Sequence, residues 1–228
     1  MDKNFPFRIR PMGKDDIAQV TDVDREAFPT QWPPTDFHYE LKNRLAHYIV
    51  VCDETRTVEE PSTEASGIRY SAGLLARLRQ ILHLSSISSA GEPEQARYYL
   101  VGYAGFWVMA DEAHITSIAV RQTYSRRGIG EFLLTSVIDM ACELKASVVT
   151  LEVRVSNVGA QSLYTKYGFA QVGLRRGYYV DRGPRGDSRE DGFVMTTEAI
   201  DSASFQTRLG ELKKAHTRKW GISESGGY

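Results

Sequence analysis

The stretch that decides the fold joins a β-rich segment to a glycine turn and a long amphipathic helix. Residues 113–120 read Ala-His-Ile-Thr-Ser-Ile-Ala-Val, and residues 125–130 read Ser-Arg-Arg-Gly-Ile-Gly. Behind the turn, apolar side chains recur at three- and four-residue spacing: Ile129, Phe132, Leu133, Val137, Met140, Ala141 and Leu144. That spacing predicts a helix with one buried face. A strand, a tight turn and a helix are therefore expected in this order.

The turn at Gly128 is a candidate anion site. Small residues at 128 and 130 let the backbone approach a ligand closely. The first turn of the following helix presents unpaired N–H groups, and Arg126 and Arg127 add positive charge beside them. The pattern is not a P-loop and lacks the third glycine of a dinucleotide fingerprint. A purely structural turn also accounts for these glycines, so the pattern alone leaves both interpretations open.

The next predicted strand, residues 147–155, carries a candidate general base. Apolar and polar side chains alternate along it, which places Glu152 on the polar face between Thr150 and Arg154. A carboxylate there could face a ligand held at the glycine turn. Most strand glutamates, however, are solvated or paired with a neighbour such as Arg154, so the position alone does not assign a role.

A further helix is expected over residues 157–167. Asn157 is well placed as its N-cap, because an asparagine side chain accepts a hydrogen bond from a free helix N–H. Tyr164 follows two turns later, where a packed aromatic side chain is the ordinary case. Neither residue identifies a function on this pattern alone.

The remaining segments complete an α/β pattern. Further strands are expected at residues 7–12, 47–52, 99–109, 170–174 and 193–196, and further helices at residues 17–28 and from about residue 35. This order predicts a mixed central sheet flanked by helices. The hairpin loop 181–192 is interpreted either as a flexible tip or as a flap over an acceptor.

Two segments lie outside this pattern. Residues 54–98 are rich in Ser and Glu, which predicts a disordered insertion between the second and third strands. An amphipathic helix is expected within it at 74–84. Residues 198–228 are interpreted as a C-terminal tail with one short helix, which leaves residues 1–197 as the folded domain.

Composition excludes several classes of protein. The 228 residues carry a formal net charge of −1, which argues against bulk electrostatic binding to nucleic acid or to an anionic membrane. No apolar run reaches the roughly 18 residues of a membrane span, and the N-terminus lacks a secretory signal. Two cysteines are too few for a disulfide framework or a zinc site. A cytoplasmic, metal-free and monomeric protein is expected.

In combination, the motifs resemble the Gcn5-related N-acetyltransferase (GNAT) superfamily, and more closely its RimI and Ard1 type protein N-terminal acetyltransferases. The matching stretches are Ile118-Ala-Val120, Ser125-Arg-Arg-Gly-Ile-Gly130, Leu151-Glu-Val-Arg-Val-Ser-Asn157, Leu163-Tyr164, Tyr167-Gly-Phe169 and Arg175-Arg-Gly-Tyr-Tyr179. The resemblance is strong over residues 115–195 and weaker over the first 53. It implies the GNAT fold, with the insertion and the tail as additions that have no counterpart in it.

The resemblance also implies a set of acetyl-CoA contacts. The backbone of Ile118, Ala119 and Val120 would hold the pantetheine arm. The pyrophosphate would be held by Arg126, Arg127, Gly128, Ile129, Gly130 and Glu131, and Asn157 would also contact the cofactor. Ser125 departs from the family, which usually has Gln or Arg there. The backbone N–H groups remain, so binding is expected to survive.

Catalytic and acceptor residues follow from the same resemblance. Glu152 would act as general base and Tyr164 as general acid, and the first residues of an acceptor peptide would lie against Phe28, Pro29, Tyr178 and Tyr179. The chemistry needs such groups, because an α-amine with a pKa of about 7.7–8.0 is mostly protonated at neutral pH. A proton donor assists the departing thiolate. Direct transfer is expected rather than a covalent route through Cys52 or Cys142.

The leading expectation is an acetyl-CoA-dependent Nα-acetyltransferase acting on a protein N-terminus. The resemblance implies the N-terminal alanine of ribosomal protein S18 as its acceptor. One alternative is an acetyltransferase of other N-termini or of a small-molecule amine. Another is a non-catalytic acyl-CoA-binding module, which the presence of both Glu152 and Tyr164 disfavours.

Overall fold

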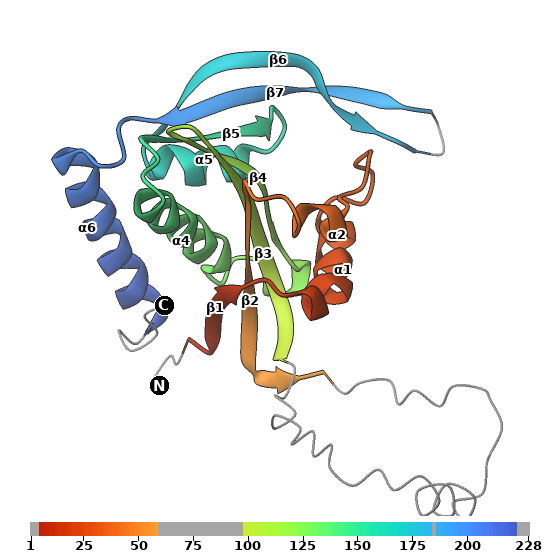
Figure 1. The fold of residues 1–228 in the computed structure, drawn as a ribbon, viewed down its shortest axis with the longest axis horizontal. Helices are drawn as coiled ribbons and strands as arrows, with labels where there is room; N and C mark the ends of the chain where they lie inside the picture. Colours follow the sequence, from red (N-terminus) through yellow and green to blue (C-terminus); the bar gives the residue numbers. More distant parts are fainter. Residues whose placement is uncertain (1–4, 59–97, 184–185, 223–228) are drawn as a thin grey trace, which may run out of the picture.

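The computed structural model describes residues 5–58, 98–183 and 186–222. A seven-stranded sheet with the order β1-β2-β3-β4-β5-β7-β6 forms its centre (Figure 1). Its strands are β1 (Phe7–Pro11), β2 (Ala46–Thr57), β3 (Tyr98–Met109), β4 (Glu112–Val120), β5 (Val148–Arg154), β6 (Phe169–Asp181) and β7 (Ser188–Thr197). Only β4 and β5 pair in parallel, and every other neighbouring pair is antiparallel. The predicted mixed α/β sheet is confirmed.

Helices cover both faces of this sheet. They are α1 (Ile17–Ala27), α2 (Phe37–Glu40), α4 (Ile129–Glu143), α5 (Val158–Lys166) and α6 (Ala203–Trp220), with short 3-10 turns η1 (Lys14–Asp16) and η2 (Gln122–Tyr124). The helices α1 and α2 lie on one face, and α4 and α5 on the other (Figure 1). None of these helices is long and apolar enough to cross a membrane.

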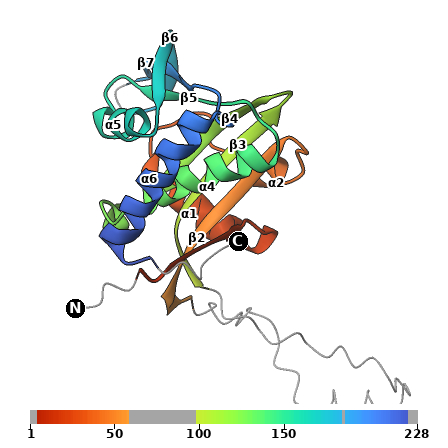
Figure 2. The same cartoon turned by 90° about the vertical axis from the view of Figure 1, so that its left-hand side faces the viewer.

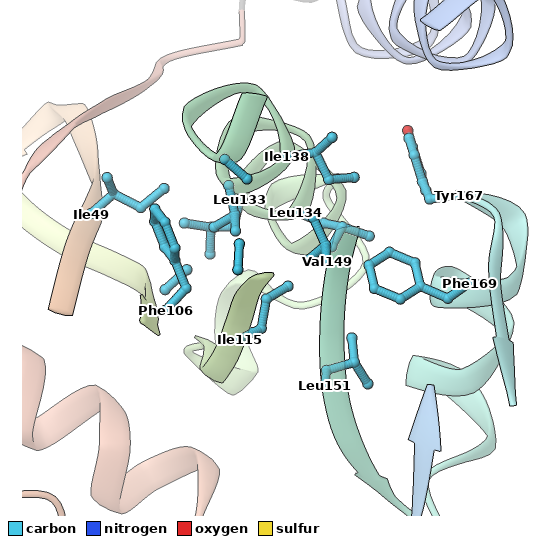
Figure 3. Packing of buried hydrophobic residues seen from close by; sticks show 14 of the residues in the cluster. Ile49, Phe106, Ile115, Leu133, Leu134, Ile138, Val149, Leu151, Tyr167 and Phe169 are labelled. Carbon is cyan, nitrogen blue, oxygen red and sulfur yellow. The ribbon is translucent and has the colours of Figure 1, made fainter. Parts of the chain in front are cut away.

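The larger core lies between α4 and the sheet. Leu133, Leu134 and Ile138 of α4 pack over Val149 and Leu151 of β5 (Figure 3). The helical and alternating patterns predicted Leu133, Val149 and Leu151 at buried positions, whereas Leu134 and Ile138 were not among the predicted helix positions. Each such side chain, when fully buried, stabilises the fold by about 1.5–3 kcal/mol. The face of β5 opposite this core is therefore the one that carries Glu152.

Several element boundaries differ from the sequence expectation. The last two strands form a much longer hairpin than residues 170–174 and 193–196, since β6 has 13 residues and β7 has 10. In contrast, α2 has only four residues, and Leu45 beyond it is exposed. Apolar and polar residues do not alternate regularly in runs such as Arg175 to Tyr179. The strand pattern in the sequence therefore ended at residue 174, before the true end of β6.

The expected insertion 54–98 is narrower than predicted at both ends. Residues 54–57 continue β2, and Tyr98 begins β3 opposite Thr57. The backbone pairing of these strands extends past the last apolar residues, which the composition could not indicate. Residues 59–97, including the helix expected at 74–84, lie outside the described part of the chain.

The C-terminal segment contains more structure than the short helix expected there. With 18 residues, α6 lies over α4 (Figure 2), and its Phe205 and Leu209 are buried in the same core as α4. The Ser202 side chain caps its first turn by accepting a hydrogen bond from the N–H of Phe205. This helix therefore adds a further layer outside α4, continuous with the core rather than a peripheral tail.

Candidate active site

The parallel strands β4 and β5 separate at the centre of the sheet. They remain paired only as far as Ile115, which lies opposite Leu151. Beyond this point, within the described part of the chain, β4 is bonded to β3 and β5 to β7, and they are no longer bonded to each other. The edge of β4 that faces β5 therefore presents unpaired backbone groups over Ile118, Ala119 and Val120, the residues expected to hold the pantetheine arm.

The turn that follows β4 is built to leave its amides free. Arg126 and Gly128 both have left-handed backbone angles, with φ of 62° and 84°. Among the described residues, no acceptor bonds the N–H groups of residues 126–131. A Cβ atom on residue 128 would lie 2.4 Å from Nε1 of Trp220, so both conformation and space require glycine. The predicted strand–turn–helix arrangement is present, with free donors at its helix end.

Glu131 differs from its neighbours in this turn, because its carboxylate is occupied. The Tyr167 hydroxyl donates to Oε1 of Glu131 at 2.6 Å, and Lys166 bonds the same oxygen. Burial raises the pKa of Glu131, but these two donors outweigh that effect and hold it below its ordinary value. The side chain thus ties α4 to α5, and only the backbone N–H of Glu131 remains for an anion.

Glu152 is the first residue of β5 beyond its pairing with β4, and its side chain is only 4% exposed. Nε2 of His114 lies 3.0 Å from Oε2, and a guanidinium nitrogen of Arg175 lies 3.0 Å from Oε1. The Tyr178 hydroxyl is another of the groups that lower the pKa of Glu152. Burial raises the pKa of Glu152, but the donors and charges around it produce a net lowering. The group is therefore an ionised, fixed carboxylate at neutral pH.

His114 is a residue of this site that the sequence reasoning missed. Its Nδ1 lies 3.0 Å from the hydroxyl of Thr150, and that hydroxyl donates its single proton to Glu112. Nε2 therefore faces the Glu152 carboxylate, and the Thr150 hydroxyl lies against the other ring nitrogen. The sequence does show that His114 and Glu152 are polar residues on two predicted strands. It does not show the register of those strands, which decides whether the two side chains meet.

Tyr164 faces the same region from α5. Its ring packs against Phe169 with centroids 5.7 Å apart, and its hydroxyl has no hydrogen-bond partner among the described residues. Burial raises the pKa of Tyr164 to about 12, so the hydroxyl keeps its proton at neutral pH. Glu152 and Tyr164 are both among the groups that raise the pKa of Tyr179 on β6.

The predicted acceptor residues come together through backbone bonds between two distant segments. The loop after α1, which contains Phe28 and Pro29, lies against the end of β6. Trp32 N–H donates to the carbonyl of Val180 at 3.1 Å, and Arg182 N–H donates to that of Thr30 at 2.9 Å. The rings of Tyr178 and Tyr179, just before these contacts, meet edge to face at 5.0 Å. One wall of the site is therefore aromatic.

A carboxylate on β6 locks this wall in place. Both oxygens of Asp181 accept hydrogen bonds from Arg154 at 2.8 Å, and Oδ1 also accepts one from Thr30. The Arg154 guanidinium additionally bonds Glu190 of β7 at 3.0 Å and lies over the Tyr179 ring. Arg154, two residues after Glu152 on the same face, thus connects β5 with the acceptor loops.

Asn157 caps α5, as its position predicted. Its side-chain oxygen accepts a hydrogen bond from the N–H of Ala160 at 3.1 Å. The side-chain amide nitrogen remains for a ligand. In the parts of the chain that the structure describes, no three His, Cys, Asp or Glu side chains are grouped to hold a metal ion.

Comparison with known proteins agrees with this geometry. Residues 72–169 match the Acetyltransferase (GNAT) family. The N-alpha-acetyltransferase RimI of Mycobacterium tuberculosis is 44% identical over 86% of this chain and 95% of the relative. The chain belongs to the GNAT family. It is accordingly an N-acetyltransferase.

Other relatives of this GNAT enzyme cover different fractions of the chain. An N-alpha-acetyltransferase of Saccharolobus solfataricus is 30% identical over 85% of this chain and 94% of the relative. The ribosomal protein bS18-alanine N-acetyltransferase of Escherichia coli is 38% identical over 42% of this chain and 62% of the relative. All of these relatives act on α-amines, according to their names.

Solved structures confirm the GNAT fold. The ribosomal-protein-S18-alanine N-acetyltransferase from Escherichia coli superposes with a TM-score of 0.58 at 22% identity, covering 86% of this chain and 96% of the other. Arabidopsis thaliana NAA60 in complex with acetyl-CoA gives a TM-score of 0.59 at 16% identity, covering 86% and 99%. At these identities the likeness concerns the fold alone.

Proposed function

We propose that this GNAT enzyme transfers an acetyl group from acetyl-CoA to the α-amine of a protein N-terminus. The N-terminal alanine of ribosomal protein S18 is the acceptor that the names of two relatives suggest. The observation that carries the proposal is the position of Glu152. It is a buried, ionised carboxylate at the point where β5 leaves β4, beside an aromatic wall built from two distant segments.

The residues along β4 and the turn fit the donor. The free N–H groups of residues 126–131 suit a diphosphate, since they lie at a helix N-terminus beside Arg126 and Arg127. The unpaired edge at residues 118–120 suits an arm that contains amide groups. When bound, acetyl-CoA supplies the acetyl thioester. No cofactor beyond this donor is needed for the proposed reaction.

Glu152 takes the proton of the acceptor amine. An ammonium cannot attack an acyl group, so a base must remove its proton at the moment of reaction or before it. The ionised Glu152 is available for this at neutral pH, either directly or through a water molecule. From Glu152, a chain of hydrogen bonds leads through His114 and Thr150 to Glu112, whose side chain is 45% exposed. These contacts fix the orientation in which the Glu152 carboxylate meets the amine.

Tyr164 supplies a proton to the departing thiolate. A raised pKa of about 12 keeps its hydroxyl protonated, and its lack of a protein partner leaves that proton free. The hydroxyl donates to the sulfur as the C–S bond breaks and regains its proton from solvent, because a tyrosinate of pKa about 12 is a stronger base than a thiolate of pKa about 8.5.

Direct transfer agrees with the state of the two cysteines. Burial raises the pKa of Cys52 and of Cys142, which leaves both as protonated and weakly nucleophilic thiols. A covalent acyl-cysteine step has no activated nucleophile in either position.

The acceptor site favours a peptide end over a bulky folded surface. Tyr178 and Tyr179 precede the part of β6 that is bonded to the loop after Pro29, and the Arg154–Asp181 ion pair and the Thr30–Asp181 hydrogen bond hold this junction. Aromatic rings around a buried carboxylate suit a short apolar residue that carries a single ammonium group. The N-terminal alanine of S18 has that chemistry.

The test is a turnover assay with the full chain. Coenzyme A release is measured with acetyl-CoA and three peptides: the S18 N-terminus starting with alanine, the same peptide with a blocked α-amine, and an unrelated alanine-initiated peptide. Rapid turnover with the first peptide, and none with the blocked one, is expected. Equal turnover with both alanine-initiated peptides would indicate a broader N-terminal acetyltransferase. Binding of acetyl-CoA without turnover on any amine would refute the enzymatic role proposed here.

A further inference from the structure

The end of α6 lies directly against the glycine turn, although no part of this helix was expected at the site (Figure 2). His216 is buried, and its Nε2 lies 2.9 Å from the carbonyl oxygen of Gly128. The same oxygen accepts the N–H of Phe132 within α4. The His216 ring stacks at 22° on the ring of Phe132. Hydrogen bonding and stacking thus hold His216 against the first turn of α4.

This contact fixes the direction of a ligand-binding amide. The carbonyl of Gly128 and the N–H of Ile129 belong to one planar trans peptide, so they point in opposite directions. Holding the carbonyl in place therefore aims the N–H of Ile129 out of the N-terminal end of α4. Burial lowers the pKa of His216, against the opposing effect of Glu131, so the ring is neutral and donates through Nε2.

A second side chain of α6 supports the same assignment. Trp220 fills the space where a Cβ of residue 128 would lie, and its indole N–H is buried with no acceptor among the described residues. Buried donors normally have a partner, so an unpaired one beside an anion-binding turn points to a ligand acceptor. Arg218 and Lys219 in the same last turn of α6 add positive charge.

We propose that the last turns of α6 complete the phosphate site of the acyl donor. His216 is a positioning residue that holds the Gly128 peptide, and the indole N–H of Trp220 donates to a phosphate oxygen of the bound CoA. The inference rests on the proposed function, because the ligand concerned is the diphosphate of acetyl-CoA. The C-terminal segment, expected as a mere tail, is then part of the site.

Isothermal titration of acetyl-CoA into the full chain tests this. His216→Phe keeps a ring and removes the donor, whereas His216→Gln keeps an N–H. Trp220→Phe keeps an aromatic ring and removes the indole donor. Both phenylalanine variants are expected to raise the Kd about tenfold, equivalent to roughly 1.4 kcal/mol. The glutamine variant should recover most of the affinity, and the acceptor KM and the kcat at saturating acetyl-CoA should stay within about twofold of wild type.

Leu209→Ala is the matched control, since it loosens α6 in the core without touching the turn. It should lower the Tm and leave the Kd unchanged. The inference would be overturned if both phenylalanine variants bound acetyl-CoA with the wild-type Kd. It would also be overturned if the Kd changed in proportion to the Tm across all variants, the Leu209→Ala control included. If only one of the two phenylalanine variants loses affinity for acetyl-CoA, the role assigned to the residue changed in the other variant is wrong. Absence of acetyl-CoA binding by the wild type would instead refute the proposed function.

Discussion

His114 of β4 and Glu152 of β5 meet at 3.0 Å just where their strands stop pairing. The contact bridges two strands that no longer share backbone hydrogen bonds, and it holds the carboxylate in one orientation. His114 is in turn held by the hydroxyl of Thr150, which lies directly opposite it on β5, two residues before Glu152. The candidate base is therefore positioned by side chains across the opening, and this arrangement leads to distinct predictions for each residue.

Glu152→Gln should lower kcat by about 10²- to 10⁴-fold, because the base is lost while the side-chain shape is kept. The Kd for acetyl-CoA should change by less than about twofold, since the carboxylate is assigned to the acceptor amine. Steady-state kinetics and calorimetry measure the two quantities. Glu143→Gln, an exposed carboxylate at the end of α4, serves as the control. Collapse of acetyl-CoA affinity with turnover intact would show that the assigned role is wrong.

His114→Phe should raise the pKa of Glu152, because it removes a hydrogen bond and a charge that lower this pKa. In the wild type the lowered folded-state value stabilises the fold above the unfolded pKa of about 4.3, and this contribution is lost as the pH falls. The difference in unfolding free energy between pH 7 and pH 4 should therefore shrink in the variant. Urea unfolding at both pH values measures it.

The control for this variant is His47→Phe, since the His47 ring stacks on Phe106 and has no carboxylate partner among the described residues. Carbon-13 titration of the glutamate carboxyls, assigned with Glu152→Gln, gives a direct reading. A Glu152 pKa that stays the same or falls in His114→Phe would contradict the arrangement described here.

Tyr164→Phe should reduce kcat by tenfold or more, about 1.4 kcal/mol in the barrier, with little change in Tm. The hydroxyl has no hydrogen-bond partner among the described residues, so its removal breaks no bond in the fold. Kinetics and differential scanning calorimetry check the two parts separately. A Tm loss large enough to explain the lower activity would assign Tyr164 a structural role only.

Gly128→Ala should destabilise the protein by at least about 1–2 kcal/mol, the cost of a left-handed conformation for a residue with a Cβ atom. The added atom would also lie 2.4 Å from Trp220. Gly130→Ala is the matched control, because only Val120 approaches its Cβ position, at 4.0 Å. That variant should be as stable as the wild type or slightly more so. Equal Tm values for the two alanine variants would contradict this geometry.

Asp181→Asn should raise the KM for the acceptor peptide about three- to tenfold and leave the Kd for acetyl-CoA unchanged. The Arg154 hydrogen bonds hold the pKa of Asp181 below its ordinary value, so the carboxylate is charged and paired at neutral pH. Losing it loosens the link between Thr30 and β6. Asp187→Asn, an exposed acid on the same hairpin, is the control. An unchanged KM for the peptide would show that the contact between Thr30, Asp181 and Arg154 does not contribute to acceptor binding.

Local patterns in the sequence account for much of the fold. The spacing of apolar residues identified α4, and alternation identified the two faces of β5, because these signals depend only on nearby residues. The strand, turn and helix around Gly128 were predictable for the same reason. The motif combination around Glu152 and Asn157 identified the family, which the comparisons confirmed.

Contacts between distant segments could not be read from such patterns. The pairing of His114 with Glu152 depends on the register of two parallel strands, which no local signal sets. Likewise, the link from Thr30 to Asp181 joins residues 151 positions apart.

The amino-acid sequence by itself determined the elements, the glycine turn and the residue types available for chemistry, since each follows from neighbours within a few positions. Only the tertiary structure decided which of these meet. It placed His114 on Glu152, and it brought His216 and Trp220 of the C-terminal segment against Gly128. The physical reason is that long-range contacts arise from the joint packing of helices on the sheet, in which α6 is buried by Phe205 and Leu209 and its far end comes to lie at the turn.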